Sequence, residues 1–249
     1  MRLLVLIFTL GLQVSFGQGL KKEYQKVILN FINCVKLNNK ECVAKKASYP
    51  FKREYPIPSI KNKQEFLNRY SQIFDEKLVK SLSTSTLSDW SDMGWRGLMY
   101  GQGKVWLDFD GKLIAVNYQS KIEEEEKTKL IEKEKSNIHS SLRTYKNPAY
   151  ILETKKFRIR IDELENSIYR YASWSIDHSM QDKPDLILKN GELTFDGSGG
   201  NHNIEFKNGE YVYQCSIIVM GGEGSSPAYL TIYKGEKEIL SQKANIVIK

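Results

Sequence analysis

Apolar residues in the first part of the chain recur at intervals of three and four positions, which is the spacing of one helical face. This pattern predicts an amphipathic helix over residues 20–35. Asn39 then stands where an N-cap belongs, ahead of a short helix over residues 41–47. Asn62, with Glu65 three positions later, predicts the capped start of a second long helix that continues to residue 78.

Near Asp89 the helical period gives way to the alternation that is typical of strands. Three strand-like runs cover residues 95–100, 104–109 and 112–118. Asp110-Gly111, between the last two, is a strong signal for a two-residue hairpin. We therefore expect helices followed by a three-stranded antiparallel meander. Residues 121–147, in which a run of glutamates is followed by lysines, predict a solvated linker helix.

Beyond Pro148 the pattern is that of strands only. Short runs of branched and aromatic residues cover 150–152, 157–161, 168–174, 185–188, 192–195, 204–206, 211–219, 228–233 and 246–248. Asn190-Gly191 and Asn208-Gly209 have the composition of tight hairpin turns. So many short strands in about 100 residues predict a sandwich or barrel. The expected fold class is α+β, with a helix-backed curved antiparallel sheet over 18–120, the linker helix, and an all-β sandwich or barrel domain over 148–249.

The first seventeen residues have the three parts of a secretory signal peptide. One cation, Arg2, precedes an apolar run over residues 3–12, and small residues at Ser15 and Gly17 stand just before Gln18. The apolar run is too short for a permanent membrane anchor. We expect cleavage near Gly17 and Gln18, and a secreted or periplasmic protein without a stable membrane anchor.

The composition is that of a globular protein, which excludes collagen-like, disordered and coiled-coil classes. The chain has 249 residues, of which 41% are hydrophobic and 27% charged, and its formal net charge is +7. A nucleic-acid binder normally concentrates its positive charge in a stripe. Here the lysine pairs are scattered, at 21–22, 45–46 and 155–156. Together with export, this makes nucleic acid an unexpected partner.

Cysteine and histidine residues give a disulfide candidate but no metal site. Cys34 and Cys42 lie eight positions apart across a turn, so a helix-to-helix disulfide and two small buried thiols both fit the pattern. Cys215 stands in a strand-like run and is expected in the core. No Cys-x-x-Cys occurs, and the three histidines are scattered. We therefore expect neither a metal site nor a cofactor.

Two motifs resemble the nuclear transport factor two-like superfamily, which includes ketosteroid isomerase and the SnoaL-like cyclases. They are the segment 39–44 before Tyr49-Pro50, and the segment 95–98 followed by 103–106. The resemblance covers residues 20–120 and implies an α+β cone. The whole chain, with segments 168–174 and 183–186, also resembles exported bacterial proteins for which no activity can be carried over.

Enzymes of that superfamily place a carboxylate, a Tyr or a His inside the cone. The region 20–120 of this chain contains no His. The inward candidates are Tyr24, Tyr70, Asp108 and Tyr118, and none of them can be matched to a catalytic position of the family. We therefore assign no catalytic residue and do not expect an enzyme.

The densest polar and aromatic cluster gives the first candidate site for a ligand. It consists of Asp89, Trp90, Asp92, Trp95 and Arg96. Two carboxylates beside an Arg could act as acid and base, or hold a polar ligand stacked on indole rings. The alternative is a strand entrance in which the Arg pairs with an Asp and the indoles fill the mouth of the cone.

The second candidate is the loop Gly197-Ser198-Gly199-Gly200-Asn201-His202, which we expect to be a long hairpin loop available to a partner. The loop 221–226 has a similar composition. Tyr169 and Tyr171 share one face of a strand, and this face is expected to be buried because the opposite face carries Arg170. A triad of Asp177, His178 and a serine is not expected, because no nucleophile elbow accompanies it.

These observations favour an exported, non-enzymatic ligand- or protein-binding protein of the bacterial cell envelope. Its partner is expected to be a small molecule, a glycan or an envelope protein. One alternative is a hydrolase or isomerase that acts in the cone domain. Another is an inhibitor or immunity-type protein that blocks a cell-wall enzyme with the loop 197–202.

Overall fold

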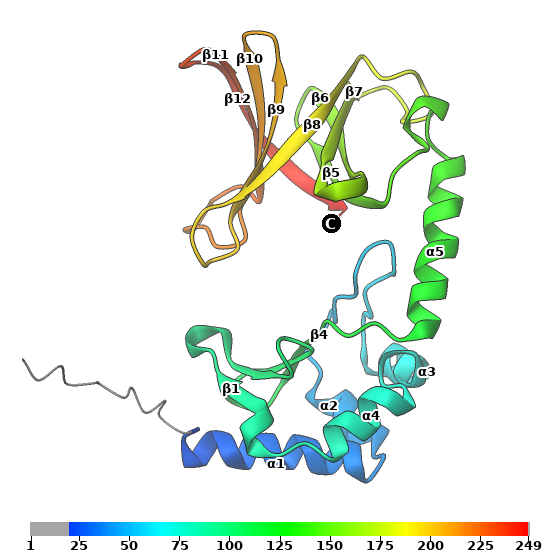
Figure 1. The fold of residues 1–249 in the computed structure, drawn as a ribbon, viewed down its shortest axis with the longest axis vertical. Helices are drawn as coiled ribbons and strands as arrows, with labels where there is room; N and C mark the ends of the chain where they lie inside the picture. Colours follow the sequence, from blue (N-terminus) through cyan, green and yellow to red (C-terminus); the bar gives the residue numbers. More distant parts are fainter. Residues whose placement is uncertain (1–19, 249) are drawn as a thin grey trace, which may run out of the picture. The chain divides into compact units, whose positions relative to one another are not determined.

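The computed structural model describes residues 20–248. The predicted signal peptide, residues 1–17, lies outside these residues. The chain is α+β and forms two compact units (Figure 1). Unit 1 contains the described part of Met1–Ser48 together with Glu76–Val116, and unit 2 contains Tyr49–Asp75 together with the described part of Asn117–Lys249. Residues 49–75, which the sequence pattern grouped with the N-terminal domain, thus belong to the same unit as the C-terminal strands.

Unit 1 combines three helices with one antiparallel sheet. The helices are α1 (Lys22–Lys36), α2 (Lys40–Lys46) and α4 (Glu76–Ser83). The strands, in sheet order, are β1 (Trp90–Asp92), β2 (Leu98–Tyr100), β3 (Val105–Leu107) and β4 (Leu113–Val116). Alternate side chains of the sheet are buried, and the ring of Trp90 meets that of Phe31 from α1 edge to face at 6.2 Å. The amphipathic face of α1 therefore contributes to the core of this unit.

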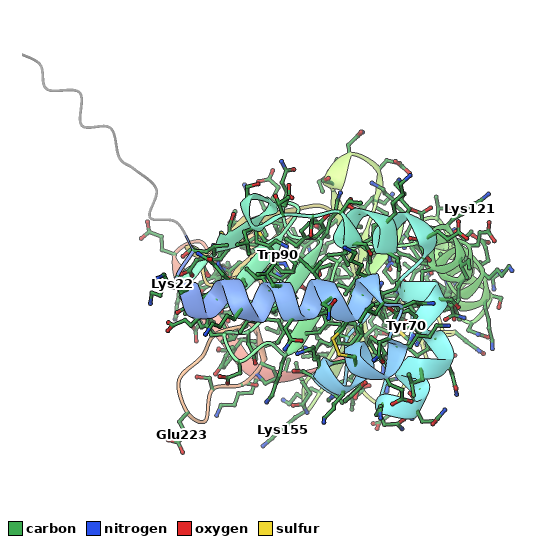
Figure 2. All side chains as sticks on the ribbon, turned by 90° about the horizontal axis from the view of Figure 1, so that it is seen from below. Lys22, Tyr70, Trp90, Lys121, Lys155 and Glu223 are labelled. Atoms are coloured by element: carbon green, nitrogen blue, oxygen red, sulfur yellow. A yellow bond between two sulfur atoms is a disulfide. The ribbon has the colours of Figure 1, made fainter. Side chains whose placement is uncertain are left out.

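Local signals in unit 1 are partly confirmed. The side chain of Asn39 accepts a hydrogen bond from the Cys42 amide at 3.0 Å, as expected for an N-cap. Cys34 and Cys42 form a disulfide between α1 and α2, drawn as a yellow bond in Figure 2. The predicted strand over 95–100 begins only at Leu98, and β1 is a strand that the pattern did not predict.

The prediction that the second long helix continues to residue 78 is wrong, because this helix ends at residue 73. Asn62 does cap α3 (Lys63–Ile73), accepting from the Glu65 amide at 3.0 Å. Phe74 then leaves the helical region and stacks its ring on Tyr70 at 5.0 Å. The Ser120 hydroxyl donates to the Gln72 carbonyl in the last turn at 2.5 Å. A contact from a distant segment therefore satisfies the helix end, which local pattern could not reveal.

Unit 2 contains a closed antiparallel barrel, one of the two all-β architectures expected for the C-terminal part. Its strands are β5 (Asn147–Glu153), β6 (Phe157–Glu163), β7 (Tyr169–Ser175), β8 (Leu186–Phe195), β9 (His202–Asn208), β10 (Tyr211–Ile217), β11 (Ala228–Lys234) and β12 (Lys237–Ile248). Each strand pairs with the next along the chain, and β12 pairs with β5. Closure leaves no open sheet edge in the barrel.

Apolar side chains from all the strands fill the interior of the barrel. Two of its larger rings, Tyr171 and Phe206, lie 5.5 Å apart and are buried. Leu152, Ile159, Leu188, Ile204, Cys215, Ile217 and Leu230 belong to the same core. An eight-stranded barrel is just wide enough for side chains to fill. The Tyr171 side of β7 is buried, as expected, but so is its opposite side.

The outer face of β6 to β8 is covered by α5 (Lys121–Ser136) and the segment after it. Ile131 of α5, with Ile138, Leu142 and Tyr145, packs against Ala172 and Trp174 on this face. The charged helix is therefore part of a second core, although its exposed face carries the expected charges. Within residues 20–248, no helix is long and apolar enough to cross a membrane.

The hairpin predicted at Asn190-Gly191 is wrong, whereas the one at Asn208-Gly209 is confirmed. Strand β8 continues through Asn190, which has a positive φ of 58°, and its register with β7 shifts nearby. The ring of Phe206 occupies the place where a side chain at Gly191 would lie: a Cβ there would be 2.2 Å from the ring. The glycine thus serves a close approach inside the barrel, not a turn.

We expect Gly191→Ala to destabilise unit 2 by about 1–3 kcal/mol, because the new methyl group overlaps a buried ring. Urea unfolding measures the change. Gly222→Ala is the control, since a Cβ there would find only the Ser225 hydroxyl at 4.0 Å. Adding Phe206→Leu to Gly191→Ala should cost less than the sum of the two single changes; strict additivity would contradict this explanation.

Candidate functional site

The structure separates the five residues of the predicted ligand cluster. Asp89 accepts hydrogen bonds from the amide and the hydroxyl of Thr86, at 2.7 and 3.0 Å, and so caps a short turn. Trp90 is buried in the core of unit 1. Asp92 accepts from the Gly94 amide at 2.9 Å. Both carboxylates thus serve local turns and are not directed at each other as an acid and base pair.

Two residues of that cluster do form an exposed surface. Trp95 is 66% exposed. Arg96 is exposed too, but its guanidinium lies 5.9 Å from the ring of Trp106 and not against either Asp. The pairing of Arg96 with a carboxylate, which was part of the alternative, is therefore replaced by a cation–π contact.

The four inward candidates of the cone fall in different units, Tyr24 and Asp108 in unit 1 and Tyr70 and Tyr118 in unit 2. Tyr24 stacks on Phe109 at 4.5 Å, and Asp108 accepts from the Asp110 and Lys112 amides in a turn. In unit 2, the Tyr118 hydroxyl donates to Asp75 at 2.7 Å. Tyr70 is buried, and burial raises its pKa to about 12. A phenol with so high a pKa is a poor proton donor at neutral pH.

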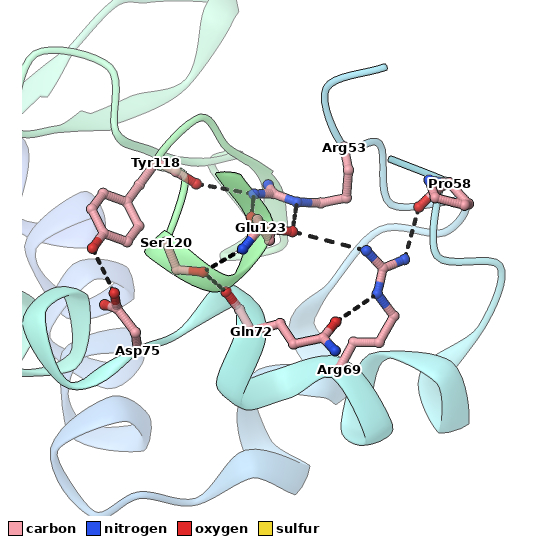
Figure 3. Close-up of polar contacts among 8 residues, drawn as sticks. All are labelled: Arg53, Pro58, Arg69, Gln72, Asp75, Tyr118, Ser120 and Glu123. Carbon is pink, nitrogen blue, oxygen red and sulfur yellow. Dashed lines mark hydrogen bonds and ion pairs between the residues drawn. The ribbon is translucent and has the colours of Figure 1, made fainter. Parts of the chain in front are cut away.

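The first of two deeply buried carboxylates, Glu123 at the start of α5, lies between two arginines (Figure 3). Arg53 donates to both of its oxygens and, at 2.9 Å, to the Tyr118 carbonyl. Arg69 of α3 approaches the same carboxylate at 3.9 Å and donates to the Pro58 carbonyl at 2.8 Å. The contacts tie α5, α3 and the segment before it together within unit 2.

The second buried carboxylate, Asp162 on β6, has a similar arrangement on the outer face of the barrel. Arg160 lies 2.7 Å from one of its oxygens and Arg170 lies 2.6 Å from the other. Arg160 also pairs with Glu134 of α5 at 2.5 Å, and Glu134 accepts a hydrogen bond from Tyr55 at 2.6 Å. Burial lowers the pKa of Arg160, but the two carboxylates raise it further, so the guanidinium stays charged.

The Asp162 network holds α5 to the barrel, and the Glu123 network joins α5 to α3 and the segment before it. Together they account for charged side chains that sequence reasoning placed in solvent. Glu123 belongs to a glutamate run expected on a solvated helix, yet its side chain is fully buried. Arg53 lies in a connector with no distinctive pattern. Since ion pairing joins residues up to 70 positions apart, the sequence offers no local signal for it.

The predicted partner loop, residues 197–202, is bound to the connection between β10 and β11. The side chain of Asn201 accepts hydrogen bonds from the amides of Val219 and Met220, both at 2.8 Å, and donates to the Met220 carbonyl at 3.0 Å. Gly200 has a φ of +85° and lies against Val219. One amide side chain therefore fixes the two loops to each other.

His202 supports the same end of the barrel from inside. Its Nδ1 donates to the Gly200 carbonyl at 2.8 Å, and its Nε2 accepts from the Tyr150 hydroxyl at 2.9 Å. The ring is buried and lies 5.5 Å from that of Phe195. Burial raises the pKa of Tyr150 to about 12, which keeps its donor proton in place. Both imidazole nitrogens are thus occupied by the loop and the barrel wall.

Three apolar side chains on these two loops remain in solvent. Phe195 is 65% exposed, Val219 is 51% exposed and Met220 is 49% exposed. We call the loops 195–202 and 218–227, which carry them, the barrel-end surface. The sequence predicted the first loop but not the second loop's role, because the hydrogen bonds of Asn201 join segments far apart in the chain.

The other candidates form no site. His178 and Asp177 are exposed in the connection between β7 and β8, where the His178 backbone carbonyl accepts from Arg158 at 2.5 Å. Burial raises the pKa of the Cys215 thiol to about 12, so it is not a nucleophile at neutral pH. In the described part of the chain, no cluster of His, Cys, Asp and Glu could hold a metal ion.

We expect Glu134→Gln to destabilise the protein by about 2 kcal/mol, because it leaves the buried Arg160 with one carboxylate in place of two. This is less than the roughly 3–5 kcal/mol for a buried charge left with no partner. Urea unfolding provides the measurement. The control is Glu132→Gln, whose pair with Lys135 on the same helix is exposed and should contribute under about 1 kcal/mol. Equal effects of the two changes would contradict a structural role for the buried network.

Thiol titration at about pH 8 should find no reactive cysteine in the native protein, because Cys215 is buried and protonated. Unfolding without a reductant should expose one thiol, and unfolding with a reductant should expose three. Three thiols without a reductant would show that Cys34 and Cys42 are not bridged. Rapid native reaction would show that Cys215 is accessible.

Comparison with known proteins gives no relative for this chain. No family model matches it, and neither a curated protein nor a solved structure is significantly similar.

Proposed function

We propose that this chain is an exported, non-enzymatic binding protein of the bacterial cell envelope, and that it binds a protein partner through the barrel-end surface. The observation that carries the proposal is the exposure of Phe195, Val219 and Met220 on two loops that Asn201 ties together. Exposed apolar side chains that are clustered and held in place are typical of protein-binding surfaces.

The rigidity of the two loops supports binding. A flexible loop loses conformational freedom when it binds, and this loss weakens the complex. Here the hydrogen bonds of Asn201 and His202 hold both loops on the closed barrel before any partner arrives. A scaffold of this kind with functional loops at one end is a common arrangement among binding domains.

The alternative of a hydrolase or isomerase has less support. Such an enzyme needs a carboxylate that can exchange a proton with a substrate. Glu123 and Asp162, the two most buried carboxylates, each have two arginines as partners, and Asp89 and Asp92 accept hydrogen bonds in turns. None of these four is directed at a second acid or base.

We also propose that the N-terminal part is a cone related to the nuclear transport factor two-like superfamily. The order of a long helix, a short helix and an antiparallel sheet in unit 1 supports this relationship. Export, with cleavage near Gly17, is supported by the sequence pattern of residues 1–17. If the protein is instead an inhibitor, it would bind a cell-wall enzyme through the same barrel-end surface and block its activity.

The experiment compares three forms of the mature chain as baits on envelope extract: the unchanged protein, Phe195→Ser with Met220→Ser, and Trp95→Ser. We expect a partner that the double variant loses and the Trp95 variant retains, and that binds again when both proteins are purified. Trp95 is a matched control, because it is an equally exposed aromatic side chain in the other unit.

The possible results separate the two candidate surfaces. Loss of the partner only with Trp95→Ser would assign binding to unit 1 and contradict the proposal. Retention of the partner by both variants would also contradict the proposal. Asn201→Ala leaves the apolar side chains in place but unties the loops, so it should weaken binding of the purified partner about tenfold through the lost rigidity.

A further inference from the structure

We infer that the partner's docking site is an apolar surface rimmed by lysine or arginine side chains. This inference rests on the proposed function and adds the chemistry of the partner. It is carried by the distribution of charge over the two ends of the barrel.

The up-and-down order of the strands decides which connections lie together. In such a barrel every second connection lies at the same end. The connections 163–169, 195–202 and 217–228 therefore share one end, which includes the barrel-end surface. The connections 153–157, 175–186, 207–211 and 234–237 lie at the opposite end.

The two ends differ in their charged residues. No Lys or Arg occurs in the three connections at the barrel-end surface, although the chain has 37 of them. Those connections carry the carboxylates Glu163, Glu165, Asp196 and Glu223. The opposite end balances acids with the lysines 155, 156, 183, 207, 234 and 237. The three connections at this end are thus acidic and apolar although the protein is basic, and Lys146, just before β5, is the cation that lies beside them.

Two of the four carboxylates are available to a partner. Glu163 pairs with Lys146 at 3.7 Å, and Asp196 accepts from the Asn203 side chain at 2.9 Å. Glu165 and Glu223 are exposed. Figure 2 labels Glu223 at the tip of its loop. Glu223 lies on the same connection as Val219 and Met220, and Glu165 lies on the connection next to the one that carries Phe195. Charges at such positions form the polar rim around an interface core.

Charge complementarity therefore selects the partner. Carboxylates around an apolar centre attract a surface with the same centre and positive charges around it, and they repel anionic surfaces. Anionic lipid, nucleic acid and acidic glycans are disfavoured at this end for the same reason. A protein with exposed lysines or arginines around an apolar patch fits both features.

The test is selection of peptides from a random phage-displayed library on the full mature chain, with counter-selection on the Phe195→Ser, Met220→Ser variant. We expect enriched peptides that combine apolar residues with Lys or Arg. Their binding should weaken at least about tenfold between roughly 0.01 M and 0.15 M salt, since exposed charges are screened over that range.

The charge variants use the same selected peptides as probes. Glu165→Gln with Glu223→Gln should weaken binding about threefold to tenfold at low salt. Glu210→Gln with Glu236→Gln, at the opposite end of the barrel, should leave it unchanged. Thermal unfolding of all variants confirms that each one is folded.

The outcomes distinguish the inference from the proposed function. Peptides that need Phe195 and Met220 but are neutral or acidic, and insensitive to salt, would overturn the basic partner and leave the binding surface intact. A selection that yields no peptide dependent on those two side chains would overturn both. Equal effects of the two charge variants would also overturn the inference, because the attraction would then not be local.

Discussion

The pairing of β12 with β5 is the contact on which the architecture of unit 2 depends. It closes the sheet, so every strand of the barrel has two neighbours and no edge remains to pair with another chain. Closure also fixes the inner volume, and side chains such as Tyr171 and Phe206 fill it. A filled barrel leaves its connections and its outer face for interactions. The outer face of β6 to β8 is already covered by α5 and the segment after it.

Buried ion pairs join the helical parts of unit 2 to each other and attach α5 to this barrel. Glu123 and Asp162 each meet two arginines, and Glu134 links α5 to Arg160 on β6. Burying these charges costs desolvation energy, which close opposite charges and hydrogen bonds offset. Such pairs also fix the orientation of the joined segments, because the N–H groups of a guanidinium donate hydrogen bonds only in certain directions. The same contacts occupy the carboxylates that could otherwise have served in catalysis.

The barrel-end surface is one of the parts of the barrel that neither the core nor α5 covers. With the interior filled and one outer face covered, the connections at one end expose apolar side chains and carboxylates without any cation of their own. Asn201 and His202 hold these connections by hydrogen bonds to the backbone. The proposed binding surface is thus built from the ends of several strands, and hydrogen bonds to the barrel hold it in place.

The sequence by itself determined the α+β class, the N-caps at Asn39 and Asn62, the β-rich C-terminal part and the loop 197–202 as a hairpin connection, because periodicity and turn composition are local properties. It misjudged the helix that ends at residue 73, the strand that continues through Gly191 and the solvent exposure of Glu123. In each case the structure shows a contact with a residue distant in sequence: Ser120, Phe206 and Arg53, respectively. Barrel closure, the pairing of buried charges and the joining of two loops by Asn201 were likewise decided only by the tertiary structure, since each depends on contacts between segments that no local pattern relates.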